Sequence, residues 1–95
     1  MKFAAVIEYC PDKAKILEVR PAHREYLTGV VKAGGLVVGG PYLDDSGAII
    51  IYEAQSQEEA EKLLRDDPFA KQGVFVSWTL RPWKVVMSNP ELVKP

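Results

Sequence analysis

The chain has very little of the residue types from which metal and disulfide sites are built. Among its 95 residues there is one cysteine, Cys10, and one histidine, His23. A single cysteine cannot form an internal disulfide, and one cysteine with one histidine falls short of any zinc ligand set. We therefore expect no metal site, and we interpret Cys10 as a small packing residue.

An excess of one sign of charge is also missing. Twelve Lys and Arg residues stand against 13 Asp and Glu residues, which gives a net charge of −1. No Lys/Arg cluster is dense enough to neutralise several phosphates, so nucleic acid is not an expected partner. The segment GVFVSWTL (residues 73–80) also lacks the aromatic and basic pattern of an RNA-binding sheet.

Long apolar runs are absent as well. The N-terminal segment MKFAAVIEYCP has an apolar run of only five residues, too short for the core of a signal peptide or for crossing a bilayer. We expect no membrane partner and, by default, a cytoplasmic location. With 47% hydrophobic and 26% charged residues, the composition is that of one ordinary globular domain.

The periodicities that are present predict four strands and two helices. Alternating or continuous apolar residues predict strands, and a stripe at about 100° per residue predicts helices. The expected strands are residues 2–9, 36–38, 48–54 and 74–82, and the expected helices are residues 12–33 and 56–66. In the last strand, we assign Val76, Trp78 and Leu80 to one face and Phe75, Ser77 and Thr79 to the other.

Pro21 complicates the first helix. Proline lacks an N–H group and pushes the preceding residue, Arg20, away from helical angles. We therefore predict one or two turns over residues 12–19, a break, and then a main helix with Pro21 as its first residue. Gly34 and Gly35 would end that helix.

The order strand, helix, strand, strand, helix, strand predicts an α+β fold of the ferredoxin-like βαββαβ type. In this fold both helices cover one face of a four-stranded antiparallel sheet. The other face also carries apolar residues and has no cover in a single copy. We predict a homodimer that packs sheet against sheet through this open face. We assign residues 1–86 to the domain and residues 87–95 to a C-terminal tail.

His23 is the main candidate for chemistry. On a helical wheel it lies between Leu27 and Val30, so it points toward the sheet. A buried imidazole needs a hydrogen-bond partner, and taken alone this favours a structural role. If Pro21 begins the helix, however, His23 lies in the first turn, where the helix dipole disfavours the imidazolium.

A partner for His23 is available in the segment DDPF (residues 66–69), at the end of the second predicted helix. A carboxylate of Asp66 or Asp67 would orient one ring nitrogen and leave the other for a substrate. The alternative interpretation of DDPF is a solvated helix stop. Arg20, one turn before His23, could hold a carboxylate through a forked hydrogen bond.

Further candidate substrate contacts come from a glycine pair and from aromatic residues. Gly39-Gly40-Pro41 matches neither a dinucleotide nor a P-loop motif, but it lets the backbone approach a ligand or the helix at a strand end. We include Gly40, Pro41, Phe69 and Phe75 as candidate substrate contacts, although aromatic residues more often form core or interface.

Several ordered motifs resemble the YCII-related (YciI-like) family over residues 1 to about 86. They are RPAHREYL (20–27), GGP (39–41), DDPF (66–69), KQGVF (71–75) and RPW (81–83). The resemblance implies ferredoxin-like subunits that form a dimeric α/β barrel, similar in architecture to muconolactone isomerases and related to chloromuconolactone dehalogenase. It also implies a His–Asp active-site pair, which falls on His23 and Asp67.

Two departures from the family pattern limit what is carried over. The family usually has Val or Lys before the Pro-aromatic pair near the end, where this chain has Arg81. Many members also have a longer connection between the second and third strands than LDDSG (residues 43–47) provides. We therefore carry over no substrate preference.

Two functions fit these features. The first is a small enzyme of the isomerase, lyase or dehalogenase kind, in which His23 and Asp67 perform acid/base chemistry on a small, anionic organic molecule without a cofactor. The second is a non-catalytic dimeric module that binds a small ligand or assists another protein, in which Asp67 only satisfies a buried imidazole. A pocket bounded by the pair and by the GGP backbone would favour the enzyme.

Overall fold

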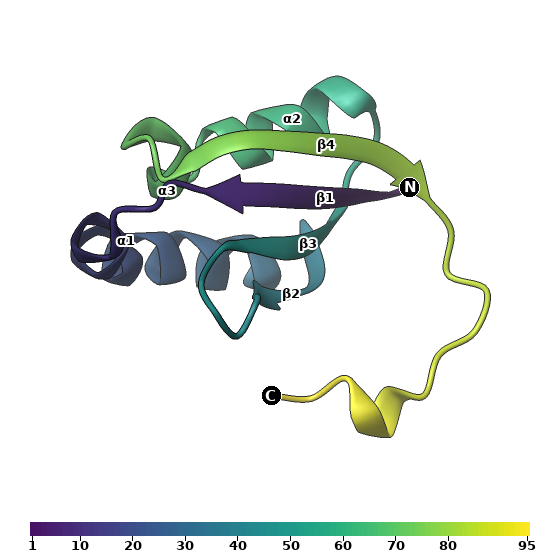
Figure 1. The fold of residues 1–95 in the computed structure, drawn as a ribbon. Helices are drawn as coiled ribbons and strands as arrows, with labels where there is room; N and C mark the ends of the chain where they lie inside the picture. Colours follow the sequence, from purple (N-terminus) through teal and green to yellow (C-terminus); the bar gives the residue numbers. More distant parts are fainter.

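The computed structural model describes residues 1–95 and contains one four-stranded sheet with helices on one side (Figure 1). The elements are β1 (Lys2–Tyr9), α1 (Lys13–Lys32), β2 (Leu36–Pro41), β3 (Gly47–Glu53), α2 (Gln57–Arg65), α3 (Pro68–Lys71), β4 (Phe75–Trp83) and a 3₁₀ turn, η1 (Pro90–Leu92). The strand order is β2-β3-β1-β4, and every neighbouring pair is antiparallel. The predicted ferredoxin-like α+β fold is confirmed.

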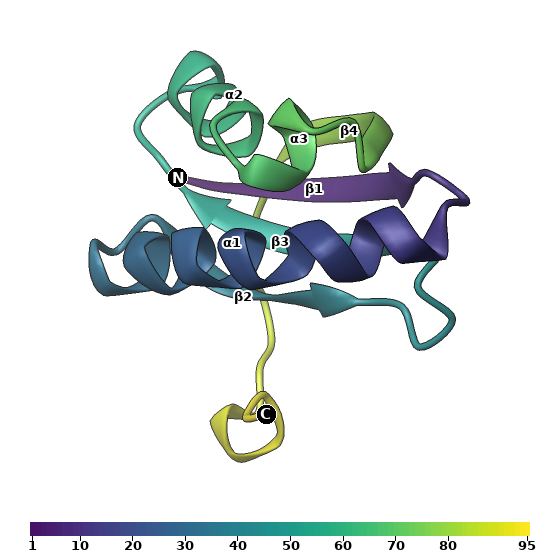
Figure 2. The same cartoon turned by 90° about the vertical axis from the view of Figure 1, so that its left-hand side faces the viewer.

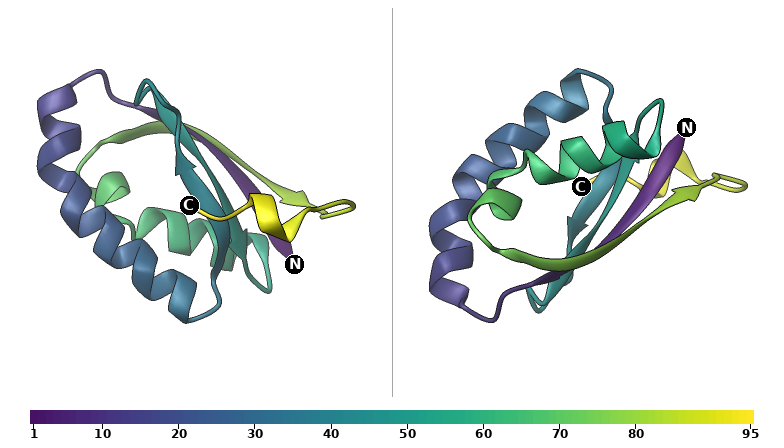
Figure 3. Two further views of the ribbon diagram at one scale, coloured as in Figure 1. Left: turned by 90° about the horizontal axis from the view of Figure 1, so that it is seen from below. Right: turned by 90° about the horizontal axis from the view of Figure 1, so that it is seen from above.

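The helices cover one face of the sheet only. Figure 2 shows α1, α2 and α3 on the same side, and Figure 3 shows the sheet lying between these helices and the C-terminal tail. The alternation in β1 decides which side chains face the helices. Its helix-facing side chains are buried, with exposed fractions of 5% or less: Phe3, Ala5, Ile7 and Tyr9. They pack in the core beneath α1 and α2.

The opposite face of the sheet is open and partly apolar. Val6 of β1 lies opposite Ile49 of β3, and their exposed fractions are 46% and 44%. Val38 of β2 pairs with Ile51 of β3, and the exposed fraction of Val38 is 40%. These side chains form the surface on which the predicted dimer depends.

The break predicted at Pro21 is wrong. Helix α1 runs without interruption from Lys13 to Lys32, with Pro21 inside it and with Asp12 as its N-cap. Proline removes the hydrogen bond to the carbonyl four residues earlier, that of Leu17. Both Pro21 and Leu17 face solvent, where water can hydrate that carbonyl group. His23 therefore lies in the middle of a long helix, and the field of a helix N-terminus does not act on it.

The assignment of faces in β4 is also partly wrong. The register between β1 and β4 shifts at Glu8/Tyr9, so that Tyr9 pairs with Phe75 while Glu8 pairs with Ser77. The extra residue on β4 is Val76, which forms a β-bulge. Phe75 consequently lies in the core beside Trp78, and Val76 is 52% exposed.

The edge strand and the third helix also differ from expectation. Strand β2 was expected over residues 36–38, but it continues through the two glycines to Pro41. Because β2 is an edge strand, a proline without an N–H donor is tolerated at its end. Helix α2 begins after Ser56, whose hydroxyl accepts from the Glu59 N–H and caps the helix. After α2, Asp67 caps the short helix α3, which the sequence did not predict.

The tail leaves the sheet at the end of β4 and turns back beneath β2 (Figure 1), and its last residue, Pro95, lines a cavity between α1 and β2. Its apolar residues are largely exposed; Met87 is 89% exposed and Leu92 is 79% exposed. No helix of the chain is long and apolar enough to cross a membrane.

Candidate functional site

His23 and Asp67 meet between α1 and the α2–α3 junction. The Nδ1 atom of His23 lies 2.7 Å from Oδ1 and 2.9 Å from Oδ2 of Asp67. His23 is 6% exposed and Asp67 is completely buried. The two residues are 44 positions apart in the sequence, and the fold brings them together because α1 and α3 pack on the same face of the sheet.

The local structure around Asp67 fixes the direction of its carboxylate. Pro68 is the first residue of α3, and Asp67 precedes it as the N-cap with an extended backbone. Its Oδ1 atom accepts a 2.9 Å hydrogen bond from the backbone N–H of Phe69. Since this buried carboxylate is then surrounded by donors, we assign the ring proton of His23 to Nδ1, which donates to Asp67.

Aromatic residues hold the imidazole ring in its plane. The ring of Phe69 stacks on that of His23, with centroids 3.8 Å apart and planes inclined by 7°. Phe75 contacts the imidazole edge-on at 6.1 Å, and both phenylalanines are almost completely buried. The two predicted aromatic contacts thus lie at the His–Asp pair. Because they are buried and pack against the imidazole, they support the ring from within the core.

The second ring nitrogen, Nε2, has no partner within the chain. The hydroxyl of Tyr52 is the only completely buried side-chain polar atom without a hydrogen bond. The Nε2 atom also makes no hydrogen bond, but it is not completely buried. It therefore retains contact with solvent, through the 8% of the His23 side chain that is exposed. An imidazole held at Nδ1 and accessible at Nε2 can accept a proton from a bound molecule.

The hydroxyl of Tyr9 is a second accessible polar atom in this region. Tyr9 is 5% exposed, and its ring contacts Phe69 and Phe75, yet its hydroxyl has no partner and is not completely buried. Burial raises the pKa of Tyr9 to about 12; the positive charge of Arg20 opposes this shift, while the negative charges of Asp67 and Asp45 add to it. The Tyr9 hydroxyl is therefore a neutral donor at ordinary pH.

Arg20 lies one turn before His23 on α1 and forms an ion pair with the β2–β3 loop. Its Nη2 atom donates to Oδ1 of Asp45 at 2.8 Å, and the two side chains are 19% and 30% exposed. Asp66, the neighbour of Asp67 in the sequence, instead faces solvent and pairs with Lys62. The structure thus separates the roles of the two aspartates in DDPF.

The glycine–proline segment lies apart from the His–Asp pair. Gly40 and Pro41 line a cavity of about 390 Å³ between α1 and β2, together with Arg24 and Leu27. Neither His23 nor Asp67 lines this cavity. The cavity at the GGP backbone is therefore separate from the His–Asp pair.

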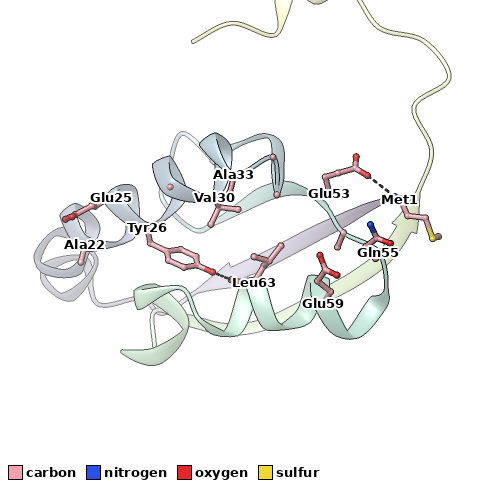
Figure 4. A pocket seen from close by; sticks show the side chains of 14 residues that line it. Met1, Ala22, Glu25, Tyr26, Val30, Ala33, Glu53, Gln55, Glu59 and Leu63 are labelled. Carbon is pink, nitrogen blue, oxygen red and sulfur yellow. Dashed lines mark hydrogen bonds and ion pairs between the residues drawn. The ribbon is translucent and has the colours of Figure 1, made fainter.

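Another cavity, of about 1040 Å³, is an open groove between the C-terminal half of α1 and α2 (Figure 4). Tyr26 lies inside it with its hydroxyl donating to the Leu63 carbonyl at 2.7 Å, and Glu53 and Glu59 lie toward the far end. The groove is lined by neither His23 nor Asp67. No group of three or more His, Cys, Asp or Glu side chains is placed to hold a metal ion.

Sequence reasoning missed two residues of this region. It did not single out Tyr9, because strand alternation shows which way a side chain points but not whether its hydroxyl is paired. It treated Asp45 as part of a turn, because no local pattern connects LDDSG to a helix 25 residues earlier. The charged residues in so short a loop were the only available signal.

The model of the YCII-related domain matches residues 1–84. The chain belongs to the YCII-related family. The match covers all four strands and ends at β4, so the tail lies outside it. Recognition of the family from RPAHREYL, DDPF and the accompanying motifs is confirmed.

Relatives and a solved structure extend this result. The chain is 33% identical over 92 residues to protein YciI of Escherichia coli, which covers 82% of this chain and 94% of that protein. It is 37% identical over 73 residues to the derivative of benzaldehyde biosynthesis cluster protein C of Emericella nidulans, covering 65% and 74%. Among solved structures, it resembles 5-chloro-2-hydroxyhydroquinone dehydrochlorinase from Burkholderia phenoliruptrix, in complex with 2,5-dihydroxybenzoquinone, with a TM-score of 0.78 and 30% identity, covering 88% and 94%. A role in small-molecule chemistry is compatible with these neighbours of this YCII-related chain.

Proposed function

We propose that this YCII-related protein is a small enzyme in which His23 and Asp67 perform acid/base chemistry on a small anionic organic molecule. The observation that supports this most strongly is the asymmetry of the imidazole. Both oxygens of Asp67 lie within 2.9 Å of Nδ1, while Nε2 faces solvent without a partner. A purely structural histidine is usually satisfied at both nitrogens, whereas a general base needs one free lone pair.

In this proposal each residue has a distinct task. The Nε2 atom of His23 takes a proton from the substrate, and Asp67 holds the ring and stabilises the imidazolium that forms. Arg20 and the hydroxyl of Tyr9 contact the anionic group of the substrate. The reaction class is isomerase-like, lyase-like or dehalogenase-like, and none of these steps requires a metal or an organic cofactor.

The substrate class follows from the dehydrochlorinase relative. That protein acts on a chlorinated hydroxyhydroquinone and was solved with a dihydroxybenzoquinone. A hydroxylated, unsaturated six-membered ring of this kind is planar, ionises readily and suits the arginine, the phenolic hydroxyl and the imidazole present here. We therefore propose small hydroxylated unsaturated rings as the substrate class of this chain.

A second candidate is supported by the cavities. None of the three described cavities is lined by His23 or Asp67, and such a contact without a pocket favours a binding or accessory module. Under this alternative, Asp67 only satisfies the buried imidazole. The His23→Ala variant would then lose about 1–3 kcal/mol of stability through the unpaired carboxylate, and its ligand affinity would hardly change.

The test compares turnover of 5-chloro-2-hydroxyhydroquinone, measured as chloride release without oxygen, among the wild type, His23→Gln, Asp67→Asn and Asp66→Asn. Related non-chlorinated hydroxyquinones are followed by absorbance. We expect His23→Gln to lose about 10²–10⁴-fold in rate, the usual contribution of an acid/base group. Asp66→Asn is the matched control, because Asp66 pairs only with Lys62 at the surface, and it should retain full rate. Full turnover by folded His23→Gln would remove His23 from the mechanism.

We further propose that the working form is a homodimer that packs through the open face of the sheet. The exposed apolar side chains of Val6, Ile49 and Val38 support this assembly. A second copy would also add walls around each site that a single chain lacks. A cytoplasmic location stays a prediction.

A further inference from the structure

The loop between β2 and β3, residues 42–46, is fastened to α1 at two points. Arg20 binds the Asp45 carboxylate, and the Nζ atom of Lys13 donates to the Asp44 carbonyl at 2.7 Å. The loop is also anchored at its end, where the Ser46 carbonyl accepts from the Tyr9 N–H at 2.9 Å. The loop therefore keeps its position independently of the contact between Arg20 and Asp45.

The ion pair lies beside the His–Asp pair. Arg20 precedes His23 by one helical turn, and it affects the ionisation of Tyr9 more than any other charged residue does. Tyr9 in turn contacts Phe69, the residue that stacks on His23. The negative charges of Asp67 and Asp45 raise the pKa of Tyr9, and the positive charge of Arg20 lowers it.

Arg20 is held by a single hydrogen bond. Only its Nη2 atom donates, and only Oδ1 of Asp45 accepts. A guanidinium group has five N–H donors and binds carboxylates best through two parallel hydrogen bonds. An incoming anion that engages two donors would thus bind Arg20 better than Asp45 does, and one-point ion pairs with solvent access contribute little to stability.

We propose that Asp45 is an internal occupant of an anion subsite centred on Arg20, one helical turn from His23, and that a carboxylate or phenolate group of the ligand displaces it. This inference rests on the proposed function, since it names the group of the substrate that the site beside His23 recognises. Displacement frees the Asp45 side chain toward solvent while the backbone anchors hold the loop.

The test measures binding of benzoate, with benzamide as its neutral counterpart, to the wild type, Asp45→Asn, Arg20→Gln and Asp44→Asn. The signals of the single imidazole, His23, report binding by NMR titration. Asp45 has a positive φ of 59°, and asparagine tolerates this conformation, so Asp45→Asn removes charge without straining the loop. Asp44→Asn is the matched control, because the Asp44 side chain is exposed, accepts from Ser46 within the loop and does not pair with Arg20.

We expect Asp45→Asn to tighten benzoate binding by about three- to tenfold, because the subsite is no longer occupied internally. Arg20→Gln should weaken it by about tenfold, while Asp44→Asn behaves as the wild type and benzamide affinity is the same in all four proteins. If the ion pair were only a structural tether, Asp45→Asn and Arg20→Gln would change affinity in the same direction or not at all.

Either of those outcomes overturns the inference, as does benzoate that binds none of the four proteins. The measurement needs no turnover, so it is independent of the proposed chemistry. Opposite effects of the two variants together with a fully active His23→Gln would retain the anion subsite and reject the acid/base mechanism. The reverse combination would retain the mechanism and reject the subsite.

Discussion

At the scale of single residues, the surroundings of polar atoms matter more than the burial of side chains. Tyr9 and Tyr52 both belong to the core, but the hydroxyl of Tyr9 retains solvent contact and that of Tyr52 has neither solvent nor partner. The inward direction of His23 could be predicted from the helical wheel, and a partner in DDPF from its position, but the choice of Asp67 over Asp66 came from the family resemblance. The contact between Arg20 and Asp45 could not, because its geometry depends on a loop whose path no periodicity describes.

Tyr52 and Tyr26 should respond with opposite sign to loss of the hydroxyl group. The Tyr52 hydroxyl is buried without a partner, so Tyr52→Phe should raise the free energy of unfolding by about 1 kcal/mol through relief of desolvation. The Tyr26 hydroxyl donates to the Leu63 carbonyl, so Tyr26→Phe should lower it by about 1 kcal/mol. Urea unfolding measures both. A Tyr52→Phe variant that is less stable than Tyr26→Phe would contradict this account of the core.

Alkaline pH should destabilise the fold through its buried tyrosine hydroxyls. Burial raises the pKa of Tyr9 and of Tyr26 from 10.0 to about 12. Between these values the unfolded chain releases protons that the folded chain retains, so stability is lost as pH rises from about 10 toward 12. The urea midpoint should fall across this window, and it should fall less steeply in Tyr9→Phe. A urea midpoint that stays constant from pH 9.5 to 11.5 would show that burial does not raise the pKa of these hydroxyls.

At the scale of elements, the sequence predicts the type and order of helices and strands better than their ends. Strand β2 continues through glycine and proline because it lies at the edge of the sheet, which its local composition does not reveal. The bulge at Val76 reverses the face of Phe75, because a strand pairing can gain a residue without any change in the alternation pattern. The continuity of α1 through Pro21 comes from packing on both sides of the proline, with Ile16 before it and His23 and Val30 after it all buried.

The proline inside α1 leads to a stability prediction. Pro21→Ala restores an N–H donor to the Leu17 carbonyl on the solvent side of the helix. Proline costs about 3 kcal/mol in a helix interior, and part of this is offset because it also restricts the unfolded chain. We expect the free energy of unfolding to rise by about 1–2 kcal/mol in urea titrations, with Glu18→Ala, also exposed on α1, as the control. A loss of stability in Pro21→Ala would mean that the proline ring makes contacts that the helix requires.

At the scale of the whole molecule, the order of elements sufficed to predict the fold, because few topologies place two helices on one face of a four-stranded antiparallel sheet. The same order predicted that one sheet face would lie uncovered, and Val6 and Ile49 are exposed there. The position of the tail could not be predicted, because residues after β4 carry two prolines and no periodicity.

The proposed dimer can be tested by charge substitution. Val6→Glu places a carboxylate at the centre of the open face, whereas Leu17→Glu places one on the outer side of α1, where Leu17 is 66% exposed. Sedimentation equilibrium at micromolar concentration should give about twice the chain mass of 10.6 kDa for the wild type and Leu17→Glu. Val6→Glu should sediment as a monomer. A monomeric wild type at this concentration would contradict assembly through the sheet.

The proposed mechanism requires that Asp67 binds the Nδ1 proton of His23 and leaves Nε2 as a free base. Because His23 is the only histidine, its two ring nitrogens can be observed without ambiguity in protein labelled with ¹⁵N-histidine. The measurement is a ¹⁵N NMR spectrum of the neutral ring, in the wild type and in the Asp67→Asn variant. We expect a pyrrole-type signal for Nδ1 and a pyridine-type signal for Nε2 in the wild type, with loss of this preference in Asp67→Asn. The opposite tautomer in the wild type, with the proton on Nε2, would contradict the proposed mechanism.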